Sequence, residues 1–171
     1  MNRKPIDVLE NAAVISRALE RGVFLTTRVG DKVNSMVIGW GHVGRIWNRP
    51  VFIAYVRDCR YTRELLDQNP EFTVNVPVNG FEKKAFAVCG TKSGRDMDKL
   101  REAGLTPVEP VAVSVPAIRE YPMTLECRVI YREEQDAARL PGEIRDKFYT
   151  VETGNHIAHY GEVLAAYILE D

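Results

Sequence analysis

The sequence predicts a mainly β protein, an antiparallel barrel with helices at its periphery. Several short runs rich in β-branched and aromatic residues are separated by short turns, as expected for strands. These runs do not alternate regularly with helices, which argues against a parallel α/β sheet and favours a barrel. With 171 residues and 45% hydrophobic content, we expect one domain over residues 1–171.

The N-terminal half is expected to begin with a helix and continue with strands. Residues 8–21 carry apolar side chains at helical spacing, with Asp7 as N-cap and Gly22 as the stop. Two β-branched runs on either side of Gly30 predict a hairpin. The remaining elements of this half are a strand over residues 50–56, in which Tyr55 is expected to fill the core, a helix over 60–69 and a strand over 71–78.

The C-terminal half is expected to contain one helix and two long strands. A helix is predicted over residues 96–103, ending at Gly104. Apolar and polar side chains alternate in "MTLECRVIYRE", residues 123–133, which predicts a strand with one face in solvent. The closing segment 156–169 predicts another strand, in which Gly161 indicates a bulge or the close approach of a flat group.

Composition excludes several classes of function. The net charge of −1 provides no overall field for nucleic acid or an anionic membrane. The chain has neither a signal-peptide-like start nor an apolar stretch of about 20 residues, so we expect a cytoplasmic protein. Three widely spaced cysteines, Cys59, Cys89 and Cys127, favour reduced thiols over a disulfide framework. His156 and His159 form H-x-x-H, but residues three apart in a strand face opposite sides, so no metal site is expected.

Two polar turns have the composition of anion sites, each just before a predicted helix. "VRDCRYTREL", residues 56–65, brings Arg57, Arg60 and two hydroxyl groups to a helix start, where unpaired amides favour phosphate. The alternative is that the two arginines pair with Asp58 and Glu64 on a solvated edge. "CGTKSGRDMDK", residues 89–99, repeats the pattern but lacks the spacing of a P-loop, which argues against ATP hydrolysis. Two such turns in one small domain favour a single phosphorylated ligand.

Three segments carry a family resemblance. Residues 32–77, 85–105 ("AFAVCGTKSGRDMDKLREAGL") and 154–167 ("GNHIAHYGEVLAAY") resemble, in order and spacing, the flavin reductase-like FMN-binding split-barrel proteins, and within them the flavoredoxin-type branch. The resemblance implies a six-stranded antiparallel split β-barrel that forms a homodimer. It also implies that FMN is bound at or near the subunit interface.

The resemblance further implies which residues serve the cofactor. Met36, Val37 and Ile38 would lie beside the isoalloxazine with Trp40 nearby; Arg57, Cys59, Arg60, Tyr61 and Thr62 would hold the phosphate and ribityl chain; Cys89, Gly90, Thr91 and Lys92 would line the flavin or its phosphate; and His156 would be the catalytic residue near flavin and nicotinamide. Three positions depart from the family pattern: Cys59 where serine is usual, Val37 where threonine is common, and Asn155 in place of an aspartate.

By resemblance, the expected activity is that of an oxidoreductase. Hydride from NADH or NADPH would pass to flavin N5, and electrons would then reach a second flavin, a redox protein or another acceptor. FMN itself carries this chemistry, while the protein binds and orients it. Two alternatives remain open: a non-enzymatic FMN electron carrier, and a haem-handling or interaction module, since split barrels host several functions.

Overall fold

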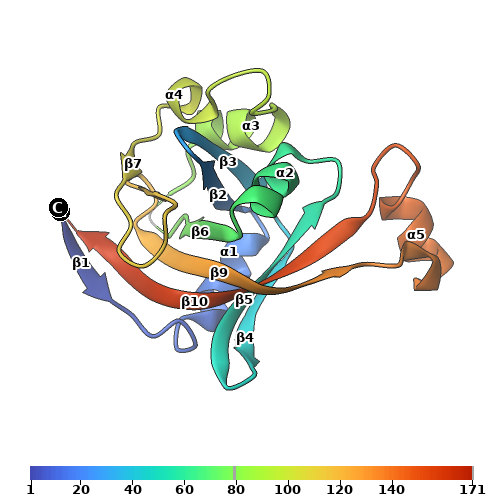
Figure 1. Cartoon of the computed structure of the whole chain (residues 1–171), viewed down its shortest axis with the longest axis horizontal. Coiled ribbons are helices and arrows are strands. Elements are labelled where there is room, and N and C mark those ends of the chain that lie inside the picture. Colours follow the sequence, from blue (N-terminus) through green and yellow to red (C-terminus); the bar gives the residue numbers. More distant parts are fainter. Residues whose placement is uncertain (79, 171) are drawn as a thin grey trace.

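The computed structural model describes residues 1–78 and 80–170 and contains one large antiparallel sheet surrounded by helices (Figure 1). The sheet consists of β1 (Asn2–Pro5), β2 (Val23–Val29), β3 (Lys32–Ile38), β4 (Gly41–Ile46), β5 (Arg49–Arg57), β6 (Glu71–Val76), β9 (Met123–Glu134) and β10 (His156–Glu170). A separate ribbon pairs β7 (Pro107–Val108) with β8 (Ala117–Ile118). The helices are α1 (Ala12–Leu19), α2 (Tyr61–Gln68), α3 (Lys83–Thr91), α4 (Lys99–Ala103) and α5 (Gly142–Phe148), with a 3-10 turn at Ala137–Arg139.

The sheet closes into a barrel through β3 and β4. Its strand order is β3-β2-β6-β9-β10-β5-β4, with β1 added to β10. Only Gly39 and Trp40 separate β3 from β4, and the N–H of Tyr55 donates to the carbonyl of Trp40 at 3.4 Å. Counted as one bent strand, β3 and β4 together join β2, β6, β9, β10 and β5 in a six-stranded split barrel. The predicted fold class, mainly β and antiparallel with peripheral helices, is therefore confirmed.

The barrel interior is filled by large apolar side chains. Phe52 and Phe72 are fully buried, and α1 adds Ile15 and Leu19 to the same core. On the outside, α2, α3 and α4 pack against β2 and β3 (Figure 1). No helix within residues 1–78 and 80–170 is long and apolar enough to cross a membrane.

The first half of β9 is buried on both faces, so the predicted solvent-facing side is wrong there. Thr124 and Glu126 are both fully buried. The Thr124 hydroxyl accepts a hydrogen bond from Asn75 at 2.9 Å. The Glu126 carboxylate accepts the backbone N–H groups of residues 111–113 and the hydroxyl of Tyr167. Polar residues are tolerated here because each is paired, which an alternating pattern cannot reveal.

Gly161 combines both features that its sequence position indicates. The register between β9 and β10 shifts between Tyr160 and Gly161, so the predicted bulge is confirmed. A Cβ atom at this position would lie 2.4 Å from the ring of Phe72. Glycine is needed here because an aromatic ring occupies the space of a side chain.

Two predicted helices begin later than expected, α1 at Ala12 and α4 at Lys99, and a third helix, α3, was not predicted. The first helix begins at Ala12 because Asp7 instead accepts the N–H of Leu9 at 2.7 Å and caps a separate turn. The unpredicted α3 includes Cys89, Gly90 and Thr91, so the second polar segment begins as the end of a helix. Only the loop over residues 92–98 precedes a helix, α4.

Beyond the barrel, β9 and β10 continue as a two-stranded ribbon. Residues 135–155 at its tip, here called the arm, include the 3-10 turn and α5 (Figure 1). The arm begins and ends beside the residues that form the candidate site.

Candidate functional site

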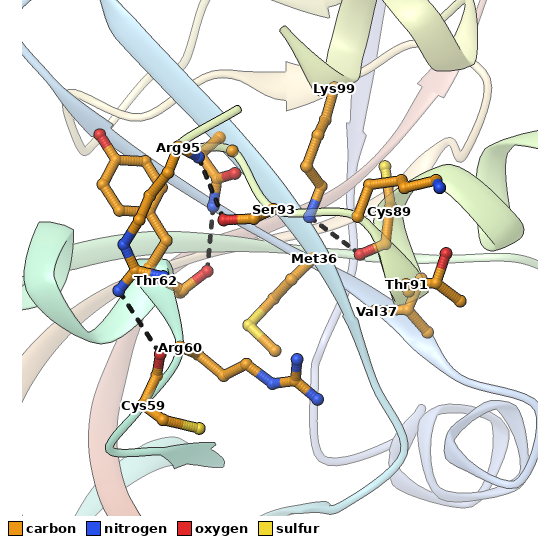
Figure 2. Close-up of a pocket in the computed structure, with 15 residues that line it drawn as sticks. Met36, Val37, Cys59, Arg60, Thr62, Cys89, Thr91, Ser93, Arg95 and Lys99 are labelled. Carbon is orange, nitrogen blue, oxygen red and sulfur yellow. Dashed lines mark hydrogen bonds between the residues drawn. The ribbon is translucent and has the colours of Figure 1, made fainter. Parts of the chain in front are cut away.

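Two adjoining pockets lie along β3 and share Met36, Val37 and Arg60. The polar pocket, drawn in Figure 2, is bounded by the start of α2, the end of α3 and the loop 92–98, and has a cavity volume of about 120 Å³. The aromatic pocket extends toward Trp40 and His156 and has a cavity volume of about 190 Å³.

The structure brings together every residue predicted for the cofactor. The polar pocket is lined by Cys59, Arg60, Tyr61 and Thr62 from one segment and by Cys89, Gly90, Thr91 and Lys92 from the other. The aromatic pocket is lined by Ile38, Trp40, Arg57 and His156. Strands and helices far apart in the sequence thus converge on the two adjoining pockets.

Arg57 is committed to the backbone of the arm. Its guanidinium donates to the carbonyl groups of Thr153 and Gly154, each at 3.1 Å, and to that of Phe148 at 3.0 Å. The Cζ atom of Arg57 lies 5.6 Å from the centre of the Tyr149 ring. Arg57 therefore holds the arm against the barrel and has few donors left for a ligand.

Arg60 is available to a ligand. Within the described residues its guanidinium forms no hydrogen bond or ion pair, and in Figure 2 it extends into the cavity beside Met36. The expected alternative, pairing with Asp58 and Glu64, is not formed. Asp58 accepts the N–H of Asn155 at 3.2 Å, and Glu64 pairs with Arg95 at 2.6 Å.

The loop 92–98 is fastened to the start of α2 by Arg95. Besides its ion pair with Glu64, the guanidinium donates to the carbonyl of Cys59 at 3.4 Å and lies 5.3 Å from the centre of the Tyr61 ring. The hydroxyl of Ser93 accepts the N–H of Arg95, which tightens the same loop (Figure 2). The wall of the polar pocket is thus fixed without a ligand.

Sequence reasoning missed Asn34, which lies at the base of the polar pocket. Its amide nitrogen donates to the Thr62 hydroxyl at 3.0 Å, and its carbonyl oxygen is buried without a hydrogen-bond partner among the described residues. Because the Thr62 oxygen accepts from Asn34, its own proton remains free to be donated. By contrast, the Thr91 hydroxyl donates to the carbonyl of Ala87 at 2.7 Å. Nothing in the alternation of β3 marks Asn34 as a pocket residue.

Lys99 is the second residue that sequence reasoning missed. It is 4% exposed, and its ammonium donates to the carbonyl of Cys89 at 2.9 Å (Figure 2). Burial lowers the pKa of Lys99, and the same burial raises the pKa of the Cys89 thiol to about 11. The thiol is therefore neutral near pH 7. The available signal was a lysine directly after Asp98, the N-cap of α4.

The aromatic pocket is built around His156. Its ring lies 4.7 Å from that of Trp40, and Trp40 lies 5.3 Å from Phe148 of the arm. The Nδ1 atom of His156 is 3.1 Å from the hydroxyl of Tyr149. Tyr55, expected in the core, is only partly buried and also lines this pocket.

Burial, with the neighbouring Arg57 charge, lowers the pKa of His156 to about 4. The imidazole is therefore neutral near pH 7. His159 is also buried, but its Nδ1 lies 3.1 Å from the carbonyl of Ile157, and it does not line either pocket. Within residues 1–78 and 80–170, no three His, Cys, Asp or Glu side chains are grouped as metal ligands would be.

Comparison with known proteins adds a family match. A family model described as the flavin reductase like domain matches residues 16–171. An uncharacterized protein of Archaeoglobus fulgidus is 35% identical over 134 residues, which cover 78% of this chain and 64% of that protein. One of Pyrococcus abyssi is 29% identical over 136 residues, covering 80% and 66%. The chain thus spans slightly less than two thirds of the length of these relatives.

Solved structures share the fold. A flavoredoxin from Methanosarcina acetivorans is 29% identical with a TM-score of 0.65, covering 87% of this chain and 68% of that one. The flavoredoxin of Desulfovibrio vulgaris is 22% identical with a TM-score of 0.68, covering 87% and 69%. An NADH:FAD oxidoreductase of Streptomyces globisporus is 19% identical with a TM-score of 0.66, covering 86% and 75%.

Proposed function

Because the chain belongs to the flavin reductase-like family, we propose that it binds FMN across the two pockets and transfers hydride from NADH or NADPH to it. One observation carries this proposal: a cationic pocket and an aromatic pocket adjoin along β3 and share Arg60. A ligand with a phosphate at one end and a flat ring system at the other matches this division.

The polar pocket has the donors that a phosphate requires. Among the described residues the Arg60 guanidinium has no partner, the Thr62 hydroxyl has a free proton, and Lys99 uses one of its three N–H groups on Cys89. The first N–H groups of α2 have no acceptor inside the helix and add a partial positive charge. This set fits a dianionic phosphate, with Arg60 as the main charged contact.

The aromatic pocket has the surface that a flavin ring requires. Met36, Val37 and Ile38 present apolar side chains and backbone along β3, and Trp40 closes the far end. FMN, when bound, supplies the electron chemistry. The chain's own residues orient the ring, keep one of its faces dry and leave room at His156 for a second planar group. The neutral His156 positions the carboxamide of nicotinamide and need not transfer a proton, since the hydride step requires none.

A second copy of the chain would complete the site. Trp47 in the turn between β4 and β5, Tyr131 on β9 and Tyr160 on β10 form an outer aromatic face, with ring centres 5.2 to 5.9 Å apart. Trp47 is 53% exposed and Tyr131 is 47% exposed. Tyr55 on the same side of the sheet lines the aromatic pocket, so a homodimer formed through this face would adjoin the flavin ring.

A non-enzymatic FMN electron carrier is the second candidate, favoured by the likeness to the Methanosarcina flavoredoxin. Both candidates use the same pockets, and both leave room for a redox protein as the electron acceptor. They differ only in whether nicotinamide reduces the bound flavin.

The absorption spectrum of the purified protein, followed by anaerobic addition of NADH and NADPH in turn, tests the proposal. We expect the visible bands of bound flavin, and their bleaching by at least one nicotinamide at a rate useful for turnover. A flavin that only dithionite reduces would favour the carrier. Protein that takes up no FMN would overturn both candidates and leave a haem-handling or interaction module.

A further inference from the structure

Three side chains form a chain of hydrogen bonds from the arm to the aromatic pocket. The hydroxyl of Tyr149 donates to the amide oxygen of Gln135 at 3.0 Å. The same hydroxyl lies 3.1 Å from Nδ1 of His156, and the two rings meet edge to face with centres 5.5 Å apart. Gln135 also donates its backbone N–H to the backbone carbonyl of His156 at 2.9 Å. The first and last residues of this hydrogen-bonded series are therefore also bonded to each other.

The number of protons available in these hydrogen bonds determines which tautomer His156 adopts. A tyrosine hydroxyl has one proton, and here Gln135 receives it. The contact between Tyr149 and Nδ1 then requires a proton on Nδ1, which donates to the tyrosine oxygen. A neutral imidazole carries only one N–H, so Nε2 is left as an acceptor.

We propose that Tyr149, oriented by Gln135, is a positioning residue that holds His156 as its Nδ1–H tautomer and presents the Nε2 lone pair to the aromatic pocket. An Nε2 acceptor selects a ligand group with N–H donors, and a primary amide is such a group. That last step rests on the proposed function, in which the primary amide is the carboxamide of nicotinamide.

The surroundings fix this arrangement in place. Arg57 binds the carbonyl of Phe148, the residue before Tyr149, and two further carbonyls of the arm. The pKa of His156, lowered to about 4 by burial and the positive charge of Arg57, keeps the ring neutral at pH 7. Trp40, on the pocket side at 4.7 Å, limits rotation of the imidazole.

Nitrogen-15 NMR of protein labelled at its three histidines reads the tautomer directly, because pyrrole-type and pyridine-type nitrogens differ in shift. His156→Ala identifies the signal. We expect a pyrrole-type Nδ1 in the wild type. In Tyr149→Phe we expect the Nδ1–H form to be largely lost. Tyr121→Phe is the matched control, because the Tyr121 hydroxyl is buried without a partner among the described residues and its ring packs against Phe24 and Phe86.

Two substitutions at Gln135 test the direction of the chain. Gln135→Glu keeps an acceptor for Tyr149, so the Nδ1–H tautomer should remain. Gln135→Lys offers only donors, so the Tyr149 proton should turn to His156 and the Nε2–H tautomer should appear. An Nε2–H tautomer in the wild type, or an unchanged tautomer in Tyr149→Phe, would overturn the proposal.

Stopped-flow kinetics separates this inference from the proposed function. Tyr149→Phe should weaken nicotinamide binding by up to about tenfold, the loss of one hydrogen bond, with dithionite reduction unchanged. If Tyr149→Phe changed the His156 tautomer but left nicotinamide binding unaltered, only the claim that Nε2 recognises the primary amide would be overturned. If neither NADH nor NADPH reduces the flavin of the wild type, the proposed function is wrong. The tautomer of His156 is still tested independently by NMR.

Discussion

Arg57 ends β5 and Arg60, three residues later, is the N-cap of α2, yet within the described residues only the guanidinium of Arg57 is hydrogen-bonded. Arg57 binds three carbonyl groups of the arm, whereas Arg60 extends unpaired between the two pockets. The two arginines, which the sequence presents as equivalent phosphate ligands, therefore have different tasks. Arg57 supports the arm, and the guanidinium of Arg60 remains available for the phosphate contact that we propose.

Arg60→Ala should weaken FMN binding by roughly tenfold or more, because it removes a charge-assisted contact worth about 1.5 to 3 kcal/mol. Riboflavin, which lacks the phosphate, should be much less affected. Fluorescence titration of both ligands measures the difference. Arg17→Ala is the control, because Arg17 is exposed on α1 and lines neither pocket. Equal losses of FMN and riboflavin would rule out a phosphate contact for Arg60.

Trp47→Gly should weaken the proposed homodimer. Trp47 and Asn48 form the turn between β4 and β5 with φ angles of 51° and 58°, a conformation unfavourable for a bulky side chain. Glycine relieves that strain, so the monomer should be no less stable while the exposed aromatic surface is lost.

Light scattering should report twice the chain mass of 19.4 kDa for the wild type and a shift toward monomer for Trp47→Gly. Val151→Ser is the control, since Val151 is fully exposed but lies in the arm, away from the aromatic face. A wild-type monomer that still binds FMN stoichiometrically would refute the shared site.

Gly161→Ala should destabilise the fold, because its Cβ would lie 2.4 Å from the Phe72 ring and 2.9 Å from Cβ of Cys127. Both neighbours are fully buried and cannot move freely, so we expect a loss of about 1 to 3 kcal/mol. Urea denaturation measures it. Gly142→Ala is the control, because there the nearest atom is 3.7 Å away. Equal stability of the two variants would mean that β10 shifts to accommodate the methyl group.

Strands and helices with a clear local sequence pattern could be predicted, whereas strands that form only by pairing with a neighbouring strand could not. The hairpin of β2 and β3 follows from two β-branched runs and a glycine turn. The strand β4, "GHVGRI", contains two glycines and forms because it pairs with β5. The strand β1, "NRKP", is charged and forms only against β10. Their strand character comes from the partner, not from their own residues.

The candidate site divides in the same way. Arg60, Tyr61 and Thr62 could be recognised because they are adjacent in sequence at a helix start. Asn34 and Lys99 could not, because their burial depends on α2 and α3 folding over them. The arm, with Tyr149 and Gln135, gave no signal, since its contact with His156 joins two ends of a long ribbon.

Acid should destabilise the protein between pH 7 and pH 5 through two histidines. Burial lowers the pKa of both His156 and His159 from 6.5 to about 4. Below pH 6.5 the two histidines take up protons in the unfolded chain but not in the folded chain. The free energy of unfolding is therefore highest above pH 6.5 and decreases as the pH falls toward 4. At pH 5 the expected loss is roughly 2 kcal/mol per histidine. Urea denaturation at the two pH values measures the loss, and His159→Gln should reduce it by about half. A free energy of unfolding that is the same at pH 7 and pH 5 would contradict both shifts.

His156→Ala should separate nicotinamide recognition from flavin binding. The imidazole lines the aromatic pocket beside Trp40 and is absent from the polar pocket, so the phosphate contacts at Arg60 and Thr62 remain in the variant. We expect it to retain bound FMN and the dimer but to be reduced by NADH or NADPH at least tenfold more slowly, because hydride transfer demands close alignment of donor and acceptor. Dithionite bypasses the nicotinamide position, so its rate should not change and serves as the control. If stopped-flow reduction by both nicotinamides were as fast as in the wild type, His156 would be a structural residue that packs Trp40 against the arm.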